Sequence, residues 1–122
     1  MNYTSITING QKVGLKFGMA SFRYLTDKFV EGISFDNNEL NEIGISHIIY
    51  GGYMNNCLVK GVLPEMTFEN IVDYVESNLQ KDDFLESLKE VVKVWTESDF
   101  IKQTQIAEEE SKTKKKISRG KK

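Results

Sequence analysis

Residues 6–18 read Ile-Thr-Ile-Asn-Gly-Gln-Lys-Val-Gly-Leu-Lys-Phe-Gly and predict a β-hairpin at the start of the chain. Apolar and polar residues alternate on both sides of Asn9-Gly10, a pair that suits a two-residue type I′ turn. With this turn, Ile6 faces Val13 on the opposite strand. Five apolar side chains then share one face of the hairpin: Ile6, Ile8, Val13, Leu15 and Phe17. Because an isolated hairpin is marginally stable in water, helices must cover that face.

After Gly18 the apolar period changes from 2 to about 3.6, which predicts an amphipathic helix. Its apolar positions lie three or four residues apart, at Phe22, Leu25 and Phe29. Glu31-Gly32 ends this helix, and residues 34–38 form a polar connection to the next apolar stretch.

The next apolar stretch, residues 40–63, is predicted to be the central helix, because its apolar residues lie on nearly every side of a helical wheel. They are Ile43, Ile45, Ile48, Ile49, Tyr50, Tyr53, Met54, Cys57, Leu58, Val59 and Val62. Gly44, Ile48 and Gly52 are spaced four apart, so another element could pack closely along them. Gly51-Gly52 could instead mark a kink.

Two further helices are predicted from their boundary residues. Gly61 and Pro64 end the central helix, and Thr67 is a good N-cap for a third helix. Asp82 or Asp83 can cap a fourth. The apolar positions of these two helices are Phe68, Ile71, Val72, Val75 and Leu79, followed by Phe84, Leu85, Leu88, Val91, Val92 and Trp95. Residues 100–101 either extend the fourth helix or form a separate turn.

Charge divides the chain into a body and a tail. Residues 1–110 carry 18 acidic and 9 basic side chains, a net charge of −9, whereas residues 111–122 carry seven basic and no acidic ones. The end of the chain also has too few apolar side chains to fold alone. The sequence therefore predicts an α+β, mostly α fold: an N-terminal β-hairpin packed on a bundle of about four helices in residues 1–104, with a charged, disordered tail in residues 105–122.

The residue types needed for a reaction centre are scarce. His47 is the only histidine and Cys57 the only cysteine. On one helix these two side chains would be about 15 Å apart along the axis, too far for a catalytic pair. They also cannot supply the usual ligands of a zinc site. We therefore expect a non-enzymatic protein with no metal and no cofactor, in which Cys57 is a small core residue and His47 is either on the helix surface or buried and hydrogen-bonded.

The cysteine count, hydropathy and charge also indicate the cellular compartment and the kind of partner. A single cysteine excludes an intrachain disulfide, and no apolar run approaches the roughly 20 residues that span a bilayer. We expect a cytosolic protein without membrane contact. Seven positive charges near the end of the chain could attract phosphates. The acidic body, however, favours a solubilising or protein-binding arm over a nucleic-acid-binding one.

The hairpin and the start of the first helix resemble the tail assembly chaperones of long-tailed bacteriophages and prophages. Members often begin with the pattern I-x-I-N-G-K-x-Y-x-L-K-F-G. The matching positions here are Ile6, Ile8, Asn9, Gly10, Leu15, Lys16, Phe17 and Gly18, with Lys12 one position after the pattern's first lysine, followed by Phe22, Arg23 and Leu25. The resemblance continues more loosely to about residue 100. The segment Tyr50-Gly-Gly-Tyr53 departs from it, because family members commonly carry alanine and leucine there.

The resemblance implies a chaperone that binds the long helical tape measure protein and helps recruit tail tube subunits. It would act in the cytoplasm of the bacterial host and be absent from the mature virion. A longer form made by frameshifting near Lys114-Lys115-Lys116 is a further hypothesis, which the gene sequence tests. Self-association remains open, as does an alternative role as a nucleic-acid-associated accessory protein acting through the lysine-rich tail. The residues we expect to contact a partner are Tyr50, Tyr53, Met54, Lys114, Lys115 and Lys116, although core packing also explains the first three.

Overall fold

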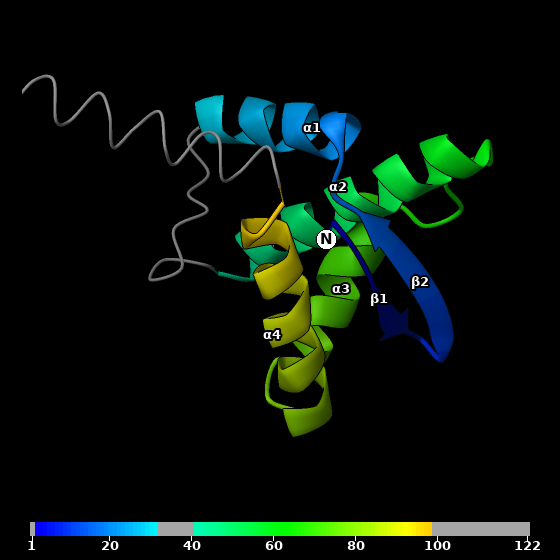
Figure 1. Cartoon of the computed structure of the whole chain (residues 1–122). Coiled ribbons are helices and arrows are strands. Elements are labelled where there is room, and N and C mark those ends of the chain that lie inside the picture. Colours follow the sequence, from blue (N-terminus) through cyan, green and yellow to red (C-terminus); the bar gives the residue numbers. More distant parts are fainter. Residues whose placement is uncertain (1, 32–40, 99–122) are drawn as a thin grey trace, which may run out of the picture.

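The computed structural model describes residues 2–31 and 41–98, and this part of the chain forms an antiparallel hairpin followed by four helices (Figure 1). The elements are β1 (Tyr3–Ile8), β2 (Gln11–Lys16), α1 (Met19–Val30), α2 (Glu42–Lys60), α3 (Phe68–Asn78) and α4 (Asp82–Thr96). This is the expected α+β, mostly helical architecture. The predicted tail and the boundary at residue 104 lie outside the described residues.

The hairpin has the predicted turn and register. Asn9 and Gly10 both have positive φ angles, 52° and 76°, as a type I′ turn requires. Ile6 pairs with Val13, and the N–H of Phe17 continues the ladder by donating to the carbonyl of Asn2 at 2.7 Å. All five apolar residues predicted to share one face are buried.

Helix α2 is central, as predicted, and contacts α1, β2, α3 and α4. It continues through its two adjacent glycines, so they mark close packing rather than a break. A Cβ at Gly51 would lie 3.2 Å from the Tyr24 ring on α1, and one at Gly52 would lie 2.9 Å from the Phe17 ring. Each glycine therefore lets a different neighbour approach the helix.

Helix α2 also caps α1. Gly18, the residue before α1, has no side chain that could cap the helix. The Oδ1 atom of Asn55 accepts hydrogen bonds from the N–H groups of Gly18 at 3.2 Å and Ser21 at 3.0 Å. These are N–H groups that the first turn of a helix leaves without an intrahelical partner.

Helix α1 is less fully covered than its pattern predicts. Leu25 is buried and Phe22 half-buried, but Phe29 is 64% exposed. Phe29 lies in the last turn of α1, and residues 32–40, which follow shortly after, are outside the described part of the chain. The apolar stripe thus begins as a core stripe and ends at the surface.

The third helix begins as predicted and the fourth does not. Thr67 forms a reciprocal capping box with Asn70, with hydrogen bonds of 3.0 and 3.2 Å. The prediction that Asp82 or Asp83 caps α4 is wrong. Lys81 is the N-cap residue and makes no side-chain cap, while both aspartates lie in the first turn. Negative charge is stabilising there through the helix dipole, so the aspartates suit this turn without capping it.

Candidate functional site

His47 and Tyr24 form a side-chain hydrogen bond between α1 and α2. The Tyr24 hydroxyl lies 2.6 Å from Nδ1 of His47, whose ring stacks on Phe68 with centroids 4.3 Å apart. His47 is buried and Tyr24 half-buried. This contact joins α1, α2 and the start of α3.

Burial keeps both groups of this contact uncharged. It raises the pKa of Tyr24, with smaller contributions from Tyr50 and Glu31. Burial also lowers the pKa of His47, aided by the positive charge of Lys28 and opposed by Glu31. At neutral pH a neutral hydroxyl and a neutral imidazole therefore share this hydrogen bond. This contact therefore links α1 and α2 through two uncharged side chains.

No metal site accompanies His47. Within residues 2–31 and 41–98 no three histidine, cysteine, aspartate or glutamate side chains come together as metal ligands. Cys57 is buried with a free thiol, ten residues along the same helix. Both side chains are buried, and Cys57 belongs to the hydrophobic core, as the sequence predicts.

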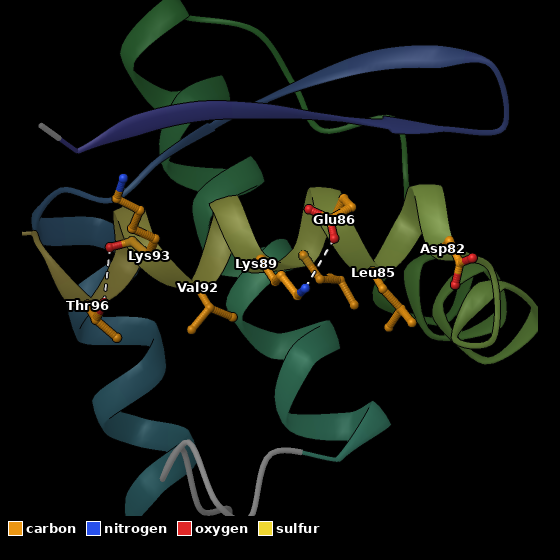
Figure 2. A pocket seen from close by; sticks show the side chains of 8 residues that line it. Asp82, Leu85, Glu86, Lys89, Val92, Lys93 and Thr96 are labelled. Atoms are coloured by element: carbon orange, nitrogen blue, oxygen red, sulfur yellow. Dashed lines mark hydrogen bonds and ion pairs between the residues drawn. The ribbon is translucent and has the colours of Figure 1, made fainter.

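A hollow along α4 is open rather than enclosed (Figure 2). Its volume is about 700 Å³, and every described residue that lines it belongs to α4. Leu85, Val92 and Thr96 point away from the hairpin, while Lys89 pairs with Glu86 at 3.1 Å. A ligand site normally gathers polar groups from several elements, so this hollow is the outer face of a helix.

An exposed apolar surface that the sequence does not predict lies at the C-terminal end of α2. Four aliphatic side chains project where α2 ends, and we call them the aliphatic tip. They are Leu58 (69% exposed), Val59 (66%), Val62 (54%) and Leu63 (88%). In Figure 1 the green C-terminal turns of α2 project past the hairpin at the upper right. Contiguous apolar side chains left in water on a small domain are typical of an interaction surface.

The backbone that carries the aliphatic tip is firmly held. Gly61 ends α2 in the left-handed conformation, with φ of 70°, and the N–H of Val62 donates to the carbonyl of Cys57 at 3.0 Å. This is a Schellman motif. Further on, the buried Tyr53 hydroxyl accepts hydrogen bonds from the N–H groups of Glu65 at 2.7 Å and Met66 at 3.1 Å. The tip is thus presented by a connection with a defined conformation.

The predicted contact residues fall in different places. Tyr53 is buried, and its ring and hydroxyl belong to the core, which favours the packing interpretation. Tyr50 is half-buried beside Tyr24 and Phe68, and Met54 is half-buried on α2. Lys114, Lys115 and Lys116 lie outside the described residues. The sequence does not distinguish the aliphatic tip, because Leu58, Val59 and Val62 fit the apolar pattern of a buried helix. The signal that could have found it is its position beside Gly61 and Pro64, where the helix ends.

Comparisons with protein-family models, curated proteins and solved structures find no significant match to this chain. Among the described helices, none combines the length and apolarity needed to cross a lipid bilayer.

Proposed function

We propose that this chain is a non-enzymatic polypeptide-binding protein, and specifically a tail assembly chaperone that binds the tape measure protein and helps recruit tail tube subunits. The observation that carries the polypeptide-binding part is the aliphatic tip, held in water by a hydrogen-bonded backbone. The specific assignment rests on the resemblance of residues 6–18 to that family.

The tip suits a protein chain better than a small molecule. It projects from the fold, so it cannot enclose a ligand, but it can enter a groove or pack against the apolar face of a partner helix. Each aliphatic side chain removed from water contributes roughly 1.5–3 kcal/mol when fully buried. Since the backbone around the tip is already ordered, little conformational entropy is lost on binding.

The proposal can be tested by co-expressing this chain with the tape measure candidate. We expect that candidate to be a long, helix-rich protein encoded immediately downstream. We expect the full chain to keep that protein in the soluble fraction. The double variant Leu58→Lys/Leu63→Lys should lose this effect while remaining folded by circular dichroism, because both side chains are already exposed.

A matched control replaces exposed apolar residues elsewhere. Phe29→Lys/Val30→Lys on α1 removes side chains that are 64% and 80% exposed, and should leave the solubilising effect unchanged. Failure of the unaltered chain to solubilise the candidate would contradict the chaperone assignment. The absence of any such downstream reading frame would do the same.

Salt dependence separates this function from the nucleic-acid alternative. Binding through the basic residues 112–122 to phosphates should weaken by orders of magnitude between low and moderate salt. Burial of the aliphatic tip in a partner should weaken little, because the hydrophobic effect is not screened. Tight, strongly salt-sensitive binding to DNA or RNA would favour the alternative.

A further inference from the structure

A groove adjoins the aliphatic tip, between β2 and the C-terminal end of α2. Its volume is about 290 Å³. The strand contributes Lys12 and Gly14, α2 contributes Asn56 and Lys60, and the connection after α2 contributes Val62 and Leu63. The last two residues also belong to the aliphatic tip, so one partner segment could contact both.

The strand side of the groove is an edge with backbone groups that no described strand pairs. β2 has β1 as its one neighbour in the part of the sheet that the structure describes. In an antiparallel pair, alternate residues direct their N–H and C=O groups toward the neighbour. Because the N–H of Phe17 donates toward β1, those of Lys12 and Gly14 are directed to the outer edge. Such an edge can accept an added strand.

The helix side of the groove holds an amide with unused hydrogen-bonding capacity. Asn56 is only 8% exposed, and its carboxamide makes no hydrogen bond within residues 2–31 and 41–98. It lies over the face of β2 at Gly14, since its Nδ2 atom is 2.6 Å from the position that a Cβ on Gly14 would occupy. Its amide atoms are not among the buried unpaired ones and so reach water, which an incoming backbone N–H and C=O could replace.

The groove is positively charged, although the body of the chain is acidic. Lys12 and Lys60 line it, are exposed, and form no ion pair with another described residue. Glu65 is the only carboxylate among its described lining residues. Helix α3, by contrast, has acidic side chains and no lysine or arginine. The groove therefore attracts negative charge, whereas α3 repels it.

We infer that this groove binds an extended segment of the partner polypeptide whose side chains are aliphatic and acidic. The segment adds to the edge of β2, hydrogen-bonds with Asn56, places carboxylates near Lys12 and Lys60, and covers Val62 and Leu63. An intact helix would not use the strand edge, because its own backbone groups are already paired. This inference rests on the proposed polypeptide-binding function and specifies the chemistry of the segment bound.

The test uses short overlapping peptides that cover the tape measure candidate, titrated against the full chain by fluorescence anisotropy. We expect the binding peptides to combine aliphatic and acidic residues. Lys12→Glu/Lys60→Glu should weaken these peptides about tenfold or more, because two attractive contacts become repulsive. Lysines outside the groove provide the matched control, and Lys81→Glu/Lys89→Glu should leave the affinities unchanged within about twofold.

A second variant tests the backbone contact without altering charge. Asn56→Leu keeps a side chain of similar size but cannot hydrogen-bond, so it should weaken the same peptides about fivefold or more. Circular dichroism and urea unfolding establish that each variant is folded. If Asn56→Leu does not fold, proline substitution at successive positions of a binding peptide replaces it, because proline lacks the N–H that strand addition requires.

Co-expression distinguishes failure of this inference from failure of the proposed function. If the unaltered chain does not solubilise the candidate, the proposed function is contradicted and this inference with it. If it does solubilise the candidate, three results would overturn the inference alone. They are binding peptides without acidic residues, equal affinity of Lys12→Glu/Lys60→Glu and the unaltered chain, and no binding of any peptide.

Discussion

Gly52 is a residue at which α2 packs tightly against the hairpin. A Cβ there would lie 2.9 Å from the Phe17 ring and 3.0 Å from Cβ of Leu15, both buried. Gly52→Ala should therefore lower the free energy of unfolding by about 1–3 kcal/mol through overpacking, measured by urea denaturation. The neighbouring Gly51→Ala provides the comparison. Both variants gain about 1 kcal/mol of helix propensity, but the closest contact at Gly51 is 3.2 Å, so Gly51→Ala should cost less. Equal losses in the two variants would contradict this packing account.

His47 makes stability depend on pH in a defined direction. Burial lowers the pKa of His47 in the folded state, so the unfolded state binds its proton more readily. The stabilising contribution is fully present above the unfolded-state pKa of about 6.5 and is lost as pH falls toward the folded-state pKa. The free energy of unfolding should therefore decrease from about pH 7.5 to about pH 5.5. In His47→Gln the free energy of unfolding should decrease less over this pH range. An identical decrease would show that His47 does not cause the pH dependence.

At the scale of elements, the end of α2 depends on one backbone conformation. Gly61 has a φ of 70°, which a side chain makes unfavourable, although the space around it is open. Gly61→Ala should reduce the free energy of unfolding by about 1 kcal/mol. Gly61→Asn should cost less, since asparagine tolerates this conformation better. Thermal or urea unfolding of the two variants checks the order, and a larger loss for Gly61→Asn would count against the Schellman cap.

The connection after α2 depends on the Tyr53 hydroxyl. Tyr53→Phe removes the acceptor of the N–H groups of Glu65 and Met66, and should destabilise the protein by about 1 kcal/mol. Faster amide hydrogen exchange at Glu65 and Met66 should accompany this loss. Tyr50→Phe is the matched control, because the Tyr50 hydroxyl makes no hydrogen bond within the described residues. Unchanged exchange in Tyr53→Phe would mean that the hydroxyl does not hold this connection.

At the scale of the molecule, features with local causes could be predicted from the sequence. Asn9-Gly10 fixes the turn and register, and Thr67 with Asn70 fixes the start of α3, because neighbours along the chain make these interactions. The last turn of α2 could not be predicted in this way. Its apolar residues resemble core residues, and their exposure depends on how far the helix extends past β2. The close packing at Gly51 and Gly52 could not be predicted either, because it depends on which elements lie on each side of α2.

The same limit applies to the candidate site. The sequence points to α2 as the contact element, and the aliphatic tip is at its end. It does not separate Tyr53, which the fold buries, from Leu63, which the fold leaves in water. That separation comes from the Schellman cap and the Tyr53 hydrogen bonds, which bring residues of the connection back onto the helix.

Site-specific crosslinking tests the account most directly. A photoreactive amino acid replaces Leu63 in the aliphatic tip or, as a control, Val30 on α1, which is similarly exposed. Each variant is irradiated in cells that also express the tape measure candidate. The account predicts a crosslinked product with that candidate from position 63 and little or none from position 30. No product from position 63, or equal products from the two positions, would contradict it.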